Sequence, residues 1–107
     1  MDRLTVLVIE QGAEAALVCA ALALRPELCV VEAADLQAAL ARLERDRTPA
    51  RLAIAGSAAL EASPQELVAR LGAHGIPVIG VAAGLPPEAR RDALAAGVRE
   101  IHVMPTD

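Results

Sequence analysis

The chain has 107 residues, a length that fits one domain able to bury its own core. Hydrophobic residues make up 55% of it and charged residues 22%, which excludes a disordered chain. The net charge of -4 is unlike the basic surface that DNA-binding proteins use. The complete absence of Phe, Tyr and Trp removes the aromatic side chains on which the bases of single-stranded nucleic acid stack. We therefore expect no direct contact with nucleic acid.

The first predicted strand lies within LTVLVIEQG, residues 4–12, and the rest of the domain is expected to pack around it. Its apolar run shows no alternation of polar and apolar residues, which is typical of a strand buried on both faces in a parallel sheet. In doubly wound sheets, ligands bind outside the carboxyl ends of the strands. This rule predicts the functional edge at Glu10, Gln11 and Gly12.

A first helix is predicted after Gly12, ending at Arg25-Pro26. Four of its apolar residues recur at helical spacing: Leu17, Ala20, Ala21 and Leu24. No charge occurs between Glu14 and Arg25, although a surface helix should have a polar outer face. Either the small Ala side chains need little cover, or the outer face of this helix contacts a partner.

The following segments alternate between strand and helix. Strands are predicted at 29–31, 51–56, 77–81 and 98–103, and helices at 34–46, at 64–71 with Gly72 ending it, and from Pro86-Pro87 to Gly97. Ser57-Ala58-Ala59 is expected to be a loop, and Ser63-Pro64-Gln65-Glu66 a capping box. Five strands alternating with four helices predict one α/β domain with a parallel sheet.

The residues expected at the carboxyl edge offer little chemistry. They are Glu10, Gln11, Gly12, Ala34, Gly56, Ser57, Ala82, Ala83, Met104 and Pro105. One carboxylate stands alone, so neither a pair of catalytic carboxylates nor a multi-oxygen Mg²⁺ site is apparent. The first turn lacks the glycines of a dinucleotide or phosphate loop, and Ser57 has no His to activate it. We predict a protein that is not an enzyme and uses no cofactor.

Cysteine and histidine positions add no metal site. Cys19 and Cys29 lack CxxC spacing and are expected to be buried structural thiols, with a disulfide or a metal site as the weaker alternative. His74 is expected in a solvated turn, and His102 is expected to pack or hydrogen-bond locally. No membrane span or signal peptide is recognised, so the expected location is the cytoplasm.

Taken together, the strand ends resemble those of response-regulator receiver domains over nearly the full chain. VLVIEQ matches the strand that ends in the acidic pair of that family, and RLAIAG matches the segment that ends in the phospho-accepting Asp. PVIGVAA matches the strand that ends in Thr-Ala, and VREIHVMP matches the strand that ends in Lys-Pro. The resemblance implies a doubly wound, flavodoxin-like five-stranded parallel sheet in the order 2-1-3-4-5. It also implies that the Met104–Pro105 peptide bond is cis.

This chain departs from the family at each chemical position. Glu10 and Gln11 stand at the positions of the acidic pair, and Gly56 stands at the position of the phospho-acceptor. Ala82 replaces the hydroxyl residue, Met104 replaces the lysine, and Ile101 stands at the aromatic switch position. The resemblance therefore points to a degenerate receiver, or pseudo-receiver. The fifth helix of the family has no counterpart before Asp107, so residues 1–107 are expected to be the amino-terminal module of a longer protein.

The resulting hypothesis is a non-catalytic, phosphorylation-independent domain of a bacterial signalling or transcription regulator that acts through a protein partner or by forming a homodimer. The alternative is a sensor that binds a metabolite or nucleotide in the emptied receiver pocket, lined by Ala55, Ser57, Ala82 and Met104. A dimer is predicted through the first helix and the sheet face next to it, with the interface residues Leu17, Ala20, Ala21 and Leu24. A charged surface with Arg90, Arg91 and Arg99 is the second candidate interface.

Overall fold

Five short apolar segments form one parallel sheet in the computed structural model, which describes residues 4–10, 13–46, 50–82 and 84–103. The strands are β1 (Leu4–Ile9), β2 (Leu28–Ala33), β3 (Leu52–Ala55), β4 (Val78–Ala82) and β5 (Ile101–Val103). Their order in the sheet is β2-β1-β3-β4-β5, and every neighbouring pair is parallel. The predicted fold class and the predicted strand order are therefore confirmed.

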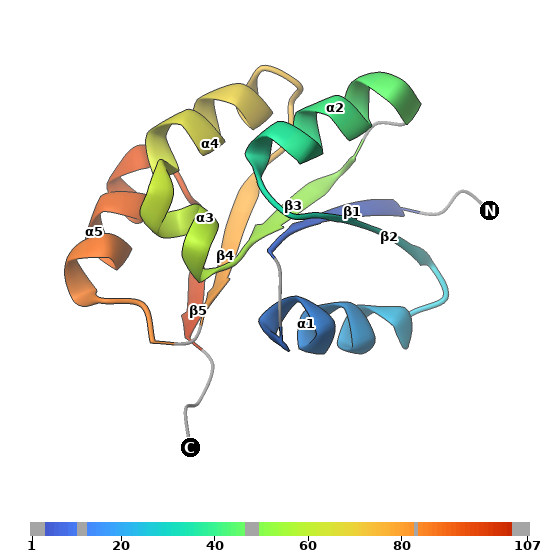
Figure 1. The fold of residues 1–107 in the computed structure, drawn as a ribbon, viewed down its shortest axis with the longest axis horizontal. Coiled ribbons are helices and arrows are strands. Elements are labelled where there is room, and N and C mark those ends of the chain that lie inside the picture. Colours follow the sequence, from blue (N-terminus) through green and yellow to red (C-terminus); the bar gives the residue numbers. More distant parts are fainter. Residues whose placement is uncertain (1–3, 11–12, 47–49, 83, 104–107) are drawn as a thin grey trace.

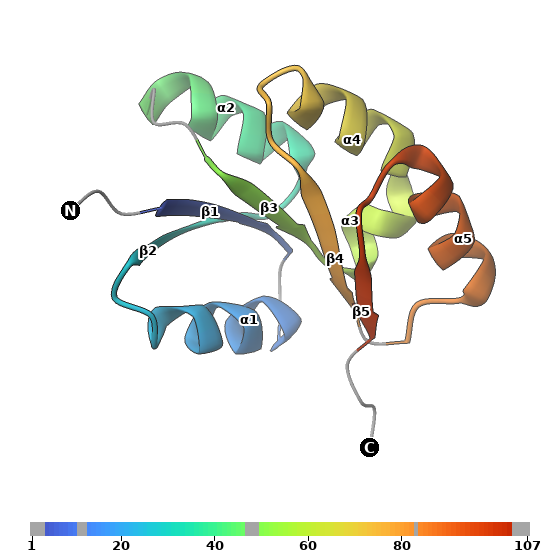
Figure 2. The ribbon, with the colours of Figure 1, turned by 180° about the vertical axis from the view of Figure 1, so that it is seen from behind.

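The helices cover the two faces of the sheet unequally. They are α1 (Ala13–Ala23), α2 (Leu36–Asp46), α3 (Ser57–Ala62), α4 (Pro64–Gly72) and α5 (Pro87–Ala96). Figures 1 and 2 show α1 by itself on one face and the other four helices on the opposite face. Within the described residues, no helix follows β5.

β1 is buried on both of its faces, as its unbroken apolar run predicts. Leu7 and Ile9 belong to the larger core beneath α2 to α5, whereas Val6 and Val8 belong to a smaller cluster on the α1 face. None of these four side chains is more than 4% exposed. Burying each of them contributes about 1.5–3 kcal/mol, which makes this strand the centre of both cores.

The α1 face is only partly covered. Val18 and Leu22 of α1 pack against the Val6 and Val8 cluster, and α1 makes its contacts with β1 and β2. Ile79 and Val81 of β4 pack against the same cluster but remain partly exposed. In the described part of the chain, no helix lies over β4 and β5 on this side (Figure 2).

The segment after β3 is helical, so the predicted loop at residues 57–59 is wrong. Ser57–Ala62 forms α3, whose Leu60 side chain is fully buried. A Cβ atom on Gly80 of β4 would lie 2.8 Å from Leu60 Cδ1 and 3.2 Å from Ile101 Cγ1. The glycine therefore leaves room for α3 to rest on the sheet, and this tertiary contact favours a helix in an Ala-rich segment that has good helix propensity.

The predicted capping box at the start of α4 does not form. Ser63 makes no side-chain cap hydrogen bond; instead, its carbonyl oxygen accepts a 3.0 Å bond from the Leu67 N–H. The reason is that Ser63 directly follows α3 and also precedes α4, so its backbone is set by the corner between two helices. A side-chain cap occurs at α2 instead, where Asp35 Oδ1 accepts a 2.8 Å hydrogen bond from the Ala38 N–H.

Two helix ends involve glycine in different ways. Gly97 ends α5 with φ 117°, as predicted, and its N–H donates to the carbonyl of Leu94. Gly72, predicted to end the preceding helix, is instead the last helical residue of α4. Gly75 makes the turn toward β4 with φ 72°, a conformation that favours glycine.

The two thiols differ from the predicted buried pair. Cys29 is exposed, and only Cys19, on α1, is half-buried; neither forms a disulfide. Cys29 is exposed because its strand lies at the edge of the sheet. The pKa of the Cys19 thiol is raised to about 11. Burial is the largest cause, and a hydrogen bond to Glu32 and the negative charge of that residue act in the same direction.

This raised pKa predicts a loss of stability at alkaline pH. Below about pH 9 the thiol is protonated in both the folded and the unfolded chain; between about pH 9 and 11 only the unfolded chain releases the proton, so the free energy of unfolding should fall. The sequence has neither Lys nor Tyr, so thiols are the only side chains with ordinary pKa values near this range. Urea unfolding at successive pH values should show this fall, and Cys19→Ser should reduce it. An equal fall in Cys19→Ser would contradict the assignment, and Cys29→Ser is the matched control.

Candidate functional site

Glu10 and Gly56 lie side by side at the carboxyl edge of the sheet. The pairing of Ile9 with Ala55 makes them the next residues on two neighbouring strands. The Gly56 N–H donates a 3.1 Å hydrogen bond to the Ile9 carbonyl, and the Glu10 N–H donates a 3.0 Å bond to the Ala33 carbonyl. Glu10 is only 9% exposed. The strand register therefore brings two of the predicted site residues together.

The side chain of Glu10 fills the space next to Gly56. A Cβ atom added to Gly56 would overlap the carboxylate of Glu10. The backbone of Gly56 is extended, with φ -89° and ψ -175°, a conformation that any residue can adopt. A side chain at position 56 would therefore need the Glu10 side chain to turn away, whereas the backbone conformation accepts any residue.

The predicted edge position at the end of β4 contributes no polar side chain to the described site. Ala82 ends β4, and its methyl group is fully buried. Gln11, Met104 and Pro105 lie outside the described residues, so the cis peptide bond at Met104–Pro105 remains a prediction. One signal in the sequence was missed: all ten basic residues are arginine, so no lysine is present to stand in for the family's active-site lysine.

The two histidines match the sequence interpretation, whereas Ser57, which was expected in a loop, begins α3 and is half-buried. His74 is exposed in the turn after α4, and the exposed His102 forms a 2.8 Å hydrogen bond between its Nε2 and Oε2 of Glu100. No group of three metal-binding side chains occurs among the described residues, and none of their helices is long and apolar enough to span a membrane.

The predicted interface residues lie on two separate surfaces. Ala20 and Ala21 of α1 are exposed, and Leu24, just beyond the end of α1, is 82% exposed. The side-chain surroundings of Leu17 lie outside the described part of the structure. Arg90 and Arg91 on α5 and Arg99 before β5 are exposed on the other surface.

Three cavities open on the side of the sheet that carries α2 to α5. One, of about 330 Å³, lies between the start of α2 and the start of α4; another, of about 430 Å³, lies between α3, α4 and the first turns of α5. The third, of about 390 Å³, lies between α2 and the strands β1 and β2. None of the three is lined by Ala55, Ser57 or Ala82, which the sequence predicted to line an emptied receiver pocket.

The overlap at Gly56 predicts a strong energetic coupling with Glu10. Gly56→Ala should lower the free energy of unfolding by about 1–3 kcal/mol, because the added methyl group must displace the Glu10 side chain. In a Glu10→Ala background the same change should cost much less, giving a coupling energy of about 1 kcal/mol or more. Urea unfolding of the four chains in this double-mutant cycle measures it.

Gly72→Ala is the matched control for that cycle. A Cβ atom there meets nothing within 4 Å, so we expect no loss of stability and a gain of up to about 1 kcal/mol. Additive effects of Gly56→Ala and Glu10→Ala would show that the carboxylate does not occupy the space beside Gly56.

Comparison with known proteins gives matches in structure alone. No protein-family model matches the chain, and no curated protein sequence matches it. The signal receiver domain of NarL from Mycobacterium tuberculosis superposes with a TM-score of 0.75 at 20% identity, over 100% of this chain and 88% of that one. A response regulator from Thermotoga maritima gives a TM-score of 0.74 at 16% identity, over 98% of this chain and 87% of that one. A response-regulator receiver domain protein from Clostridium thermocellum gives a TM-score of 0.73 at 14% identity, over 97% of this chain and 84% of that one.

These likenesses agree with the strand order and with the near-complete coverage expected from the sequence. Because the sequence identities are 20% or less, these likenesses show a shared backbone fold and do not show the chemistry of the site. The chain thus has the fold of response-regulator receiver domains.

Proposed function

We propose that this chain is a pseudo-receiver: a non-catalytic domain that takes part in bacterial signal transduction or transcription regulation through protein contacts, without being phosphorylated. The observation that carries the proposal is the pairing of Gly56 with Glu10 at the carboxyl edge. The proposal extends to residues 1–107 being the amino-terminal module of a regulator.

The first argument concerns the acceptor. In the family that the sequence resembles, an Asp follows the third strand and forms an acyl phosphate. Here Gly56 follows β3, and the carboxylate of Glu10 fills the space in which the side chain of an acceptor would begin. A carboxylate attached to residue 56 would need Glu10 to move first.

The second argument concerns the groups that would support phosphorylation. Mg²⁺ binds through several oxygen ligands, and a phosphoryl group is stabilised by a nearby cation. Ala82 supplies a methyl group where the family has a hydroxyl, and the sequence contains no lysine. Loss of the hydroxyl and of the lysine favours a domain that does not use phosphoryl chemistry.

The proposal predicts that phosphoryl analogues leave the domain unchanged. Beryllofluoride with Mg²⁺ should cause no saturable shift of the Gly56, Ser57 or Ala82 amide signals beyond that caused by Mg²⁺ alone. Two-dimensional amide NMR measures this, with an active receiver domain as the positive control. Saturable shifts centred on these three amides would overturn phosphorylation-independent action.

For the partner, we propose a homodimer formed through α1 and the sheet face beside it. Ala20, Ala21 and Leu24 present an exposed apolar surface at the carboxyl-terminal end of α1, and Ile79 and Val81 of β4 remain partly exposed on the same side of the sheet. Charged groups are sparse on α1, so desolvating its outer surface on association costs little. The second exposed surface, with Arg90, Arg91 and Arg99, is the competing interface.

Two matched substitutions separate these surfaces. Leu24→Glu should convert the dimer to a monomer, because it places a charge in the apolar contact; Leu94→Glu, on the exposed side of α5, should leave the dimer intact. Size-exclusion chromatography with light scattering measures both. The reverse pattern would move the interface to α5, and a monomeric parent chain would exclude the homodimer in favour of a different protein partner.

The alternative function, a metabolite or nucleotide sensor in the receiver pocket, has less support. Glu10 takes the space beside Gly56, and Ala55 and Ala82 are fully buried. We therefore favour protein interaction as the function of this edge.

A further inference from the structure

β2 is an edge strand, and half of its backbone groups face away from the sheet (Figure 1). On its inner side it pairs with β1, and the N–H of Leu4 donates a 2.9 Å hydrogen bond to the carbonyl of Glu27. The backbone groups of successive strand residues point in opposite directions, so every second residue from Glu27 onward faces β1. The N–H and C=O groups of Val30 and Glu32 therefore lie on the outer edge, where no strand among the described residues pairs with them.

This edge lacks the features with which sheets usually prevent pairing with a further strand. Protected edge strands are commonly short, bulged, or interrupted by Pro or Lys. β2, Leu28–Ala33, pairs with β1 in an unbroken register, and its sequence LCVVEA contains neither Pro nor Lys. Its single charged residue is Glu32, whose carboxylate accepts a hydrogen bond from the Cys19 thiol of α1. Another extended chain is the partner that can satisfy the backbone groups of such an edge.

α1 adds a wall of small, uncharged side chains beside this edge. The hydrogen bond between Cys19 and Glu32 places Cys19 on the β2 side of α1, and Ala23, one turn later, lies on the same side. Ala23 is exposed, and no residue in 15–24 is charged. Small uncharged side chains allow a second helix to approach closely at little cost in desolvation.

We propose that β2 pairs with β2 of a second copy of this chain, antiparallel, about a two-fold axis at Val30, so that the two sheets become one continuous sheet. The Val30 N–H of each copy donates to the Val30 carbonyl of the other, and the Glu32 N–H of each copy donates to the Leu28 carbonyl of the other. This inference narrows the homodimer proposed above, on which it rests, to the β2 side of α1.

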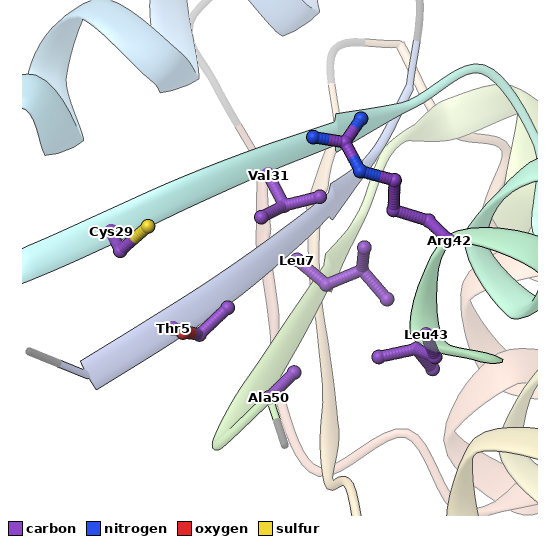
Figure 3. A pocket seen from close by; sticks show the side chains of 7 residues that line it. All are labelled: Thr5, Leu7, Cys29, Val31, Arg42, Leu43 and Ala50. Atoms are coloured by element: carbon purple, nitrogen blue, oxygen red, sulfur yellow. The ribbon is translucent and has the colours of Figure 1, made fainter. Parts of the chain in front are cut away.

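The same axis brings the two α1 helices together. It is perpendicular to the joined sheet, so both helices lie on one side of it. Because each α1 packs over β1 and β2, the helix axes are separated by two strand spacings, roughly 10 Å, which is a usual distance for packed helices. On the other face, Arg42 reaches from α2 toward β2 (Figure 3); its repulsion of the second copy's Arg42 opposes the pairing and is screened by salt.

Two properties of β2 select the register. An axis at Cys29 would move Glu32 beyond the start of the second copy's strand, so its N–H would lose its acceptor. An axis at Val31 would bring the two Glu32 carboxylates near each other, whereas the axis at Val30 keeps them four positions, or about 13 Å, apart. In the chosen register Cys29 lies opposite Val31 of the second copy, and Figure 3 shows both side chains on the α2 side of β2.

Disulfide cross-linking in high-salt buffer tests this register. A non-hydrogen-bonded antiparallel pair has its Cα atoms about 4.5 Å apart, a distance that a disulfide can span. A Cys19→Ser chain that also carries Val31→Cys should therefore form a covalent dimer on mild oxidation, measured by non-reducing electrophoresis and intact mass. Cys19→Ser alone should not, because the two Cys29 residues are not opposite each other. Cys19→Ser with Arg70→Cys, which places the second thiol on α4, is the matched control and should not either.

Val30→Pro tests the backbone contact. It removes the N–H on the axis without removing a hydrogen bond to β1, and Pro is tolerated in edge strands where the N–H faces outward. The dissociation constant of the dimer, from light scattering over a dilution series, should rise by about tenfold or more. Val30→Thr keeps the N–H and the branched shape and should change it much less. Far-UV circular dichroism checks that Val30→Pro is folded, and the cross-linking test does not depend on that variant.

The outcomes separate this inference from the homodimer proposal. A monomeric parent chain would overturn both. A dimeric parent that gives no covalent dimer with Val31→Cys, or whose folded Val30→Pro variant dimerises as tightly as Val30→Thr, would overturn the edge pairing alone. Cross-linking of the Cys19→Ser chain through Cys29 itself would overturn the register at Val30.

Discussion

The burial of β1 on both faces is the constraint on which the rest of the structure depends. Because its side chains alternate between the two faces, Leu7 and Ile9 enter the core beneath α2 to α5 while Val6 and Val8 enter the cluster beneath α1. A shift of one residue in its register would exchange these two sets and misplace every neighbouring strand. The same register fixes Glu10 and Gly56 as neighbours, so the packing of the core also builds the carboxyl edge.

At that edge the chain keeps the receiver fold, and our proposal that it is not phosphorylated rests on how this edge is packed. Glu10 is held at 9% exposure in the space where a side chain on residue 56 would begin, and the methyl group of Ala82 at the end of β4 is fully buried. The carboxylate of Glu10 takes the space next to Gly56, and for this reason we propose that the function lies on the outer surfaces of the domain.

Those outer surfaces are unequal because the helices are distributed unequally. α1 lies by itself over β1 and β2, and β4 presents partly exposed apolar side chains beside it. On the opposite face the described residues form α2 to α5, which cover the larger core.

The sequence alone predicted the elements whose signal is local. Unbroken apolar runs predicted the strands, Gly97 predicted the end of α5, and the strand-end pattern predicted the fold and the order 2-1-3-4-5. The absence of a carboxylate at Gly56 was also evident from the sequence. These features depend on residue type and spacing, which the sequence contains in full.

Only the tertiary structure decided the features that depend on residues far apart in the chain. α3 forms because Gly80, twenty positions farther along the chain, gives Leu60 a place on the sheet. Cys29 is exposed because β2 became an edge strand, and the carboxylate of Glu10 reaches the space beside Gly56 because β1 pairs with β3. Side chains separated by tens of residues acquire distances and burial only when the sheet is assembled, and for this reason no local pattern could predict them.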